Sequence, residues 1–414
     1  MLGSIVVLGN SGVEIRGGES RIAFRQAVLM ETPGSLGLSP SRRTAKHLSR
    51  IGNGCSMFIE RSGRNDMKML RGTPKHLGTT GEMNGFIYLM LTLPFKCNYR
   101  CPKCFNLVNN QPVTSGDPLT LDEIMRTIDA AKALGGRVVV IAGEGEPTLD
   151  ANIRTIVSRI DDFGMIPIIY SNASSLNSDW ATFYRERNAC LVIAMDSLKP
   201  EVYAQLTGTR KEMLAVVLRN LGALRKTYSD TITEKNGLRV VNLALNMTVC
   251  SRNEEEIEDL KALAGEDMYF VCNPLARHGN AIGNWSTLVD GESDWLRQQA
   301  LAQQYSESGG PLTLNRVGLC GYSVNGIGIG PFGHYMTCAY TARTNDLLGT
   351  IRNRSLREAY AFKNSQELQH YARHGVVPCL VRANSFDLFV GELGRGYSER
   401  SSFDAPVAFH AQRQ

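Results

Sequence analysis

Short apolar runs alternate with longer segments of helical spacing between residues 86 and 274. The runs are rich in β-branched and aliphatic residues, which is typical of strands. "RVVVIAG" at 137–143 is almost continuously apolar, as in a parallel strand that is buried on both faces. Six runs of this kind predict strands at 86–95, 137–143, 165–172, 189–197, 238–250 and 268–274.

The segments between these runs repeat their apolar residues every three to four positions, which predicts helices. The first, 120–136, ends in a pair of glycines, a common helix stop. The others are 151–164, 179–187, 212–228 and 254–265. About six strand–helix units indicate an α/β fold with a parallel sheet and outer helices. Because a closed barrel of this type needs eight units, we expect a partial (β/α)6 barrel across residues 85–290.

The regions on either side of the predicted barrel differ from it in composition and in residue pattern. Residues 1–84 are rich in turn formers and basic residues, which favours a flexible leader over a folded module. After the barrel, 326–338 has the Gly and Pro pattern of a tight hairpin, and 356–375 has helical spacing. We therefore expect a small C-terminal domain at 310–395 and a tail at 396–414.

Composition and charge limit the class of protein, its cellular compartment and its partners. The chain is 43% hydrophobic and 21% charged, as is typical of soluble globular proteins. It has no apolar run long enough for a membrane span and no secretory signal at its start, so we expect a cytoplasmic protein. The net charge of +5 arises in residues 1–82, where twelve Lys/Arg face six Asp/Glu. The nearly neutral remainder argues against a nucleic-acid-binding face.

Three of the ten cysteines lie close together in "CNYRCPKC" at 97–104, directly after the first predicted strand. Cys97, Cys101 and Cys104 could hold three corners of a cubane iron–sulfur cluster and leave one iron open to another ligand. Zinc is the alternative, but zinc sites more often pair two CxxC-type elements, and no second one follows. A disulfide is disfavoured in a reducing cytoplasm.

The spacing C-x3-C-x2-C, followed by the aromatic Phe105, resembles the characteristic motif of the radical S-adenosylmethionine (radical SAM) superfamily. The resemblance covers residues 86–285 and implies a [4Fe–4S] cluster on the three cysteines, with SAM at the open iron. "GEGEP" after the second strand resembles the GGEP motif, which in the family holds the amino group of SAM. Its residues are Gly143, Glu144, Gly145, Glu146 and Pro147, and Glu144 replaces the usual first glycine.

Polar residues at further strand ends are implied as cofactor-binding by the same resemblance. Similar enzymes contact the methionine or the ribose of SAM at these positions, although such residues could also simply cap loops. They are Ser171 and Asn172, Asp196 and Ser197, and more weakly Asn246 and Thr248 on the fifth strand and Arg277 after the sixth.

A second set of cysteines follows the barrel. Cys320 and Cys338 enclose a C-x12-G-x4-C pattern that resembles the opening of SPASM and twitch domains. The resemblance implies an auxiliary iron–sulfur cluster held by Cys320, Cys338 and Cys379. Arg382 stands where a twitch domain would have another cysteine, so the fourth ligand is left open. The alternative is a set of buried structural cysteines without a cluster.

Two more cysteines, Cys250 and Cys272, end predicted strands on the side where a substrate would lie. They could be packing residues. The alternative is a thiol that returns a hydrogen atom to a substrate radical, as in radical epimerases.

The resemblance implies that one electron, from a donor such as flavodoxin or ferredoxin, cleaves SAM. The resulting 5′-deoxyadenosyl radical then abstracts a hydrogen atom. A compact twitch-like domain favours a small polar substrate, such as an amino sugar, an aminocyclitol or a nucleoside-like compound, which is oxidised or epimerised. A maturase of ribosomally made peptides is the alternative, but residues 1–84 lack the pattern of a peptide-recognition module. A non-catalytic metal-binding scaffold is the alternative from another class.

Overall fold

The structure is a computed structural model that describes most of the chain from residue 68 onward. The described residues are 68–79, 85–94, 96–105, 107–108, 111–112, 116–143, 145–305, 321–337, 345–374 and 389–393. Contacts divide the chain into two units, and all of these residues belong to the unit formed by Asp66–Gly81 and Gly85–Gln414. Most of the predicted leader, the predicted tail and four predicted site residues lie outside the described residues: Glu144, Cys320, Cys338 and Cys379.

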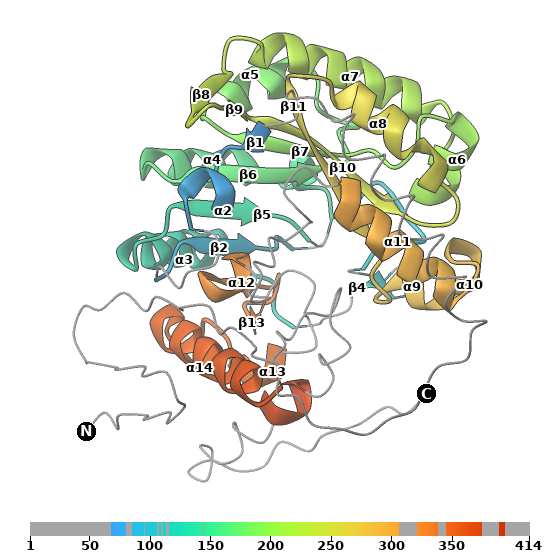
Figure 1. Ribbon diagram of the computed structural model, residues 1–414. Coiled ribbons are helices and arrows are strands. Elements are labelled where there is room, and N and C mark those ends of the chain that lie inside the picture. The colour runs from blue at the N-terminus through green and yellow to red at the C-terminus, as the bar shows by residue number, and fades with distance from the viewer. Residues whose placement is uncertain are drawn as a thin grey trace, which may run out of the picture. The chain divides into compact units, whose positions relative to one another are not determined.

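The main sheet has eight strands in the order β11-β10-β7-β6-β5-β2-β12-β13 (Figure 1). Its first six positions are parallel strands, and these are the six strands that the sequence predicts. They are β2 (Tyr88–Leu91), β5 (Val138–Ile141), β6 (Ile166–Ser171), β7 (Cys190–Ala194), β10 (Leu243–Val249) and β11 (Met268–Pro274). The partial (β/α)6 barrel is therefore confirmed.

Helices connect the parallel strands, as predicted. Local sequence signals fix the start of the first helix, where Thr120 and Glu123 form a reciprocal capping box. At its end, Gly135 adopts a positive φ of 98°, which stops the helix. The barrel helices are α3 (Leu121–Ala133), α4 (Ile153–Asp162), α5 (Ser178–Glu186), α6 (Pro200–Thr207), α7 (Met213–Tyr228) and α8 (Ile257–Ala264).

The shorter and later elements complete the described chain. The strands among them are β1 (Lys68–Leu70), β3 (Leu107–Val108), β4 (Gln111–Pro112), β8 (Thr233–Lys235), β9 (Leu238–Val241), β12 (Gly326–Ile329) and β13 (Tyr335–Met336). The helices are α2 (Pro74–Leu77), η1 (Pro147–Leu149), η2 (Glu254–Glu256), α9 (Asn280–Gly283), α10 (Trp285–Leu288), α11 (Glu292–Tyr305), α12 (Gly321–Val324), α13 (Asn345–Leu348) and α14 (Leu356–His374). No helix in the described part of the chain is long and apolar enough to span a membrane.

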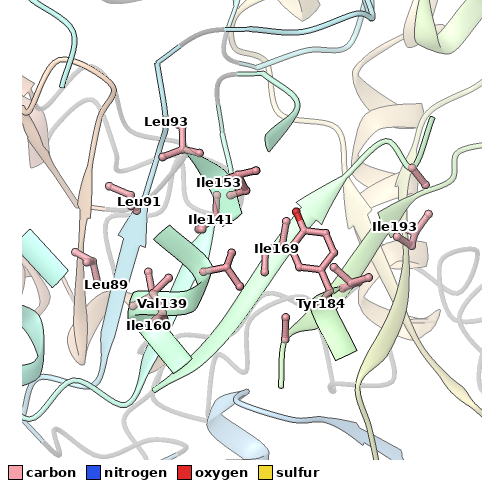
Figure 2. Close-up of a cluster of buried hydrophobic side chains, with 14 of the residues drawn as sticks. Leu89, Leu91, Leu93, Val139, Ile141, Ile153, Ile160, Ile169, Tyr184 and Ile193 are labelled. Atoms are coloured by element: carbon pink, nitrogen blue, oxygen red, sulfur yellow. The ribbon is translucent and has the colours of Figure 1, made fainter. Parts of the chain in front are cut away.

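The parallel strands are buried on both faces. On one face Leu89, Val139, Ile169 and Ile193 pack with helix residues in the largest hydrophobic cluster (Figure 2). On the other face a second cluster collects alternate residues of the same strands, among them Tyr88, Val138 and Cys190. This double burial explains why the strands are almost continuously apolar in sequence.

The predicted leader extends too far. Residues 68–79 are folded: β1 pairs in parallel with β9, and α2 follows it. Leu70 is buried in the second hydrophobic cluster, and the Lys68 ammonium donates hydrogen bonds to the carbonyls of Gly265 and Met268. The boundary expected at residue 84 is therefore wrong for this segment, which packs against the barrel.

The predicted strand 238–250 is two strands of different sheets. β9 belongs to a three-stranded sheet with β1 and β8, whereas β10 belongs to the main sheet. The break falls at Asn242, whose side-chain amide donates to the Thr231 carbonyl while its own carbonyl accepts from Leu191. Because the run 238–250 is apolar on both sides of Asn242, the sequence does not indicate that β9 and β10 pair with strands of different sheets.

The predicted hairpin at 326–338 is confirmed as β12 and β13, which pair antiparallel. In addition, β12 pairs in parallel with β2, so that Ile327 lies opposite Leu89. The first described strand of the predicted C-terminal domain therefore joins the sheet of the barrel. The predicted helix 356–375 is confirmed as α14.

The packing of β1 leads to a stability prediction. Replacing Leu70 by Ala should lower the free energy of unfolding by about 2–5 kcal/mol, because the substitution leaves a cavity in a closed cluster. Leu296→Ala is the matched control, since Leu296 is 56% exposed and should be nearly neutral. Urea denaturation of both variants measures the difference. Equal stability of the two would show that β1 is not packed as described.

Candidate active site

The three clustered cysteines lie on the loop that follows β2, at the carboxyl end of the parallel sheet. Cys97, Cys101 and Cys104 are half-buried thiols. The turn is compact: the Cys104 N–H donates to the Cys101 carbonyl at 3.1 Å, and the Tyr99 N–H donates to Cys97 Sγ at 3.4 Å. The structure therefore brings together on one loop the three residues that were predicted as metal ligands.

Residues after β11 fix this loop from one side. The Asn280 N–H donates to the Cys104 carbonyl at 2.8 Å, and its side-chain amide donates to the Cys101 carbonyl at 3.1 Å. Gly279 has a φ of 60°, and a Cβ there would lie 2.4 Å from the Cys104 carbonyl oxygen. Only glycine permits so close an approach. Sequence reasoning missed Gly279 and Asn280, which carry no motif of their own.

The described residues of the segment 143–147 also contact the chain at the start of the cysteine loop. The Glu146 N–H donates to the Lys96 carbonyl at 2.7 Å. Gly145 has a φ of 102°, and a Cβ there would lie 2.6 Å from the same oxygen. Leu93, Gly143 and Pro147 line a small pocket together with these residues. The predicted SAM-binding segment thus borders the loop that carries the cysteines.

The Glu146 carboxylate joins the ends of two strands. It is 3% exposed and accepts hydrogen bonds from the hydroxyls of Thr148 and Ser171, each at 2.8 Å, and from the Asn172 N–H at 2.7 Å. Burial raises the pKa of Glu146, while these hydrogen bonds oppose the shift. The Asn172 side chain in turn donates to Asn98 of the cysteine loop at 3.0 Å. Three predicted site residues therefore form one network.

A buried ion pair ties the cysteine loop to two further strand ends. Lys103 Nζ lies 3.0 Å from Asp196 Oδ2, with side-chain exposures of 13% and 3%. The other oxygen of Asp196 accepts the Thr248 N–H at 2.9 Å. Burial alone would lower the pKa of Lys103, but the charges of Asp196 and of nearby thiols outweigh it and raise this pKa. Sequence reasoning missed Lys103, although its place between Cys101 and Cys104 was a usable signal.

Two other predicted cofactor-binding residues have protein partners. The Ser197 hydroxyl is fully buried and donates to Glu256 Oε1 at 2.7 Å. Arg277 is exposed, with its guanidinium carbon 5.3 Å from the ring centre of Trp285. Their roles toward a cofactor stay predictions.

The two predicted hydrogen donors lie in separate apolar clusters. Cys272 is fully buried in the main cluster, and Cys250 in a smaller one with Leu206 and Leu275. Burial raises the pKa of Cys250 to about 11 and that of Cys272 to about 12. Such surroundings suit packing residues, and a donor role stays a prediction.

Comparison with known families identifies the class of this barrel. Residues 92–264 match the family model described as Radical SAM superfamily, so this part of the chain is a radical SAM domain. The cofactors of this class are a [4Fe–4S] cluster and SAM. The donor set fits the cluster, because three half-buried thiols lie on one loop. Burial raises the pKa of Cys97 and of Cys101, so both must lose protons when they bind iron.

The curated relatives are more specific in name. A probable GTP 3′,8-cyclase from Thermococcus kodakarensis is 31% identical over 179 residues, which are 43% of this chain and 53% of the relative. A GTP 3′,8-cyclase from Pseudomonas syringae pv. syringae is 28% identical over 233 residues, 53% of this chain and 62% of the relative. The chain thus spans about half to three-fifths of these relatives.

Solved structures of low identity also align with the chain. The crystal structure of Streptococcus suis SuiB bound to its precursor peptide SuiA is 15% identical, covers 77% of each chain and has a TM-score of 0.47. A likeness this distant carries no conclusion about substrate.

The Lys103–Asp196 pair leads to a prediction about the cysteine loop. Asp196→Asn should lower the free energy of unfolding by about 3–5 kcal/mol, because it leaves the Lys103 ammonium buried without its counter-charge. Adding Lys103→Met should restore part of the loss. Urea denaturation of the cluster-free variants measures this coupling.

The exposed pair of Lys211 and Glu201, 3.7 Å apart, is the matched control, with an expected coupling below about 1 kcal/mol. If the two pairs coupled equally, the buried contact would not be formed.

Proposed function

We propose that this protein cleaves SAM reductively and uses the 5′-deoxyadenosyl radical to abstract a hydrogen atom from a small polar, nucleotide-like substrate. The observation that carries the proposal is the loop of Cys97, Cys101 and Cys104, held at the carboxyl end of the sheet against the segment 143–147. A bound [4Fe–4S] cluster would supply the electron and the open coordination position for SAM.

The residues of this chain would hold and orient these groups. The cysteine thiolates bind the iron, and the carbonyls of Cys101 and Cys104 are fixed by Asn280, which limits movement of the loop. The Lys103 ammonium lies close enough to Cys101 and Cys104 to affect their ionisation, so its charge would favour the thiolates. The small pocket beside Gly145 would receive the amino group of SAM, as the resemblance of this segment to the GGEP motif implies.

The substrate class is supported by the curated relatives, whose names specify a nucleotide. This favours a nucleoside-like compound over an amino sugar, an aminocyclitol or a ribosomally made peptide. The mass of the product identifies the fate of the substrate radical. Dehydrogenation would remove a pair of hydrogens, and epimerisation would keep the mass but incorporate deuterium from heavy water.

The first test concerns SAM cleavage. Replacing Cys97, Cys101 and Cys104 together by Ala should abolish formation of 5′-deoxyadenosine with a strong reductant, because no thiolate remains to hold the cluster. Cys190→Ala is the control, since Cys190 is buried in the second hydrophobic cluster and should not be needed. Undiminished cleavage in the triple variant would contradict the assignment. No cleavage by the intact protein would favour a non-catalytic scaffold.

The second test concerns the substrate. Nucleotides deuterated on the ribose should transfer deuterium to 5′-deoxyadenosine, because the radical takes the hydrogen directly from the substrate carbon. Mass spectrometry of 5′-deoxyadenosine detects the transfer. Deuterated amino sugars, aminocyclitols and peptides are tested in parallel. Transfer from a peptide alone would replace the nucleotide proposal with peptide maturation.

An auxiliary cluster on Cys320, Cys338 and Cys379 belongs to the same proposal, as an electron acceptor for the substrate radical or as a site that binds substrate at an open iron. If it forms, the reconstituted protein should hold about eight irons, and the triple variant at 97, 101 and 104 should keep about half of them. Iron analysis with Mössbauer spectroscopy decides this. An iron-free triple variant would show that only one cluster binds.

A further inference from the structure

A cluster of metal-type ligands lies outside the barrel loops, near the end of the described chain. One ring nitrogen each of His370 and His374 and one carboxylate oxygen of Glu392 lie within 4.8 Å of one another. His370 and Glu392 are buried, and His374 is partly exposed. Among the described residues, no other group of three His, Cys, Asp or Glu side chains has its ligand atoms this close together.

The spacing of the two histidines makes them neighbours on one helix face. His370 and His374 are four residues apart on α14, so their side chains lie one turn apart. Their rings are 4.6 Å apart between centroids. Glu392 comes from the segment 389–393, where Phe389 packs edge-on against the His370 ring at 5.4 Å. The cluster therefore joins a helix to a segment that follows it in sequence.

The carboxylate lies between the two rings. His370 Nδ1 is 2.7 Å from Glu392 Oε2, and His374 Nε2 is 2.9 Å from Glu392 Oε1. Ligand atoms around a tetrahedral zinc ion are about 3.3 Å apart, given metal–ligand bonds of about 2.0–2.1 Å. A small outward movement of the side chains would therefore admit an ion.

Both rings face the carboxylate with a nitrogen that can bind a metal: Nδ1 of His370 and Nε2 of His374. Imidazole nitrogens and carboxylate oxygens are both ligands of zinc-type ions. The three side chains therefore present a convergent set of ligand atoms from α14 and from segment 389–393.

We propose that His370, His374 and Glu392 bind a single divalent transition-metal ion of the zinc type. Two imidazoles and a carboxylate are a donor set that zinc uses, with the fourth position free for water. Arg373 Nη1 lies 3.0 Å from Glu392 Oε1 and would remain as an outer hydrogen-bond partner that orients the carboxylate. The ion would clamp segment 389–393 to α14. This proposal does not rest on SAM cleavage.

The test uses the full chain after anaerobic reconstitution with iron and sulfide, so that the cluster-forming cysteines are occupied. Zinc is added, excess is removed by gel filtration, and both metals are measured. The wild type should retain about one zinc per chain. His374→Gln and Glu392→Gln should each weaken zinc retention at least tenfold, because each removes a ligand. Arg357→Gln is the matched control and should retain zinc, since Arg357 is exposed on the same helix and contacts none of the three ligands.

A second measurement keeps the test independent of folding defects in the variants. Cobalt(II) bound to wild-type protein should give the visible absorption of a tetrahedral site without a thiolate charge-transfer band. Zinc should also raise the melting temperature of the wild type and not that of His374→Gln. Three results would overturn the proposal: no zinc on the wild type, equal zinc on all variants, or loss of iron rather than zinc from His374→Gln.

Discussion

The burial of both faces of the parallel sheet is the constraint on which this structure depends. With Tyr88 and Leu89 facing two different hydrophobic clusters, no polar side chain can be placed along the middle of β2 without losing its hydration. Polar chemistry is therefore confined to the places where strands end. The cysteine loop follows β2, the segment 143–147 follows β5, and Asp196 follows β7. Because all these strands are parallel, their ends meet at one edge, and the candidate site is assembled there.

Once polar groups are concentrated at that edge, each must find a partner, since an unpaired buried charge costs several kcal/mol. Glu146 meets this demand with hydrogen bonds from neighbouring strand ends, and Lys103 meets it with Asp196. These contacts cross from one loop to the next. The same interactions that satisfy buried charges therefore also fix the loops relative to one another. Such preorganisation is what a reactive radical requires, because the substrate must be held in place before the radical forms.

Sequence reasoning succeeded where the signal is local and failed where it is not. The six strands and the cysteine loop could be predicted because their residues stand together in the chain. β1 was not predicted because it has only three residues, begins with a lysine, and pairs with β9 far along the chain. The hydrogen bonds from Ser171 and Asn172 to Glu146 could not be predicted because these two residues lie at the end of another strand. Glu144 and the three C-terminal cysteines lie outside the described residues, so their predicted roles are unchanged.

The pairing of β12 with β2 has a consequence for how the chain is made. β2 is among the first barrel strands to be synthesised, yet one of its two edges is covered only when residues 326–329 arrive. Until then, a nascent or truncated chain would present an open, apolar strand edge, which favours association with other chains. Of the six parallel strands, the one that carries the cysteine loop is thus the last to gain both of its neighbours.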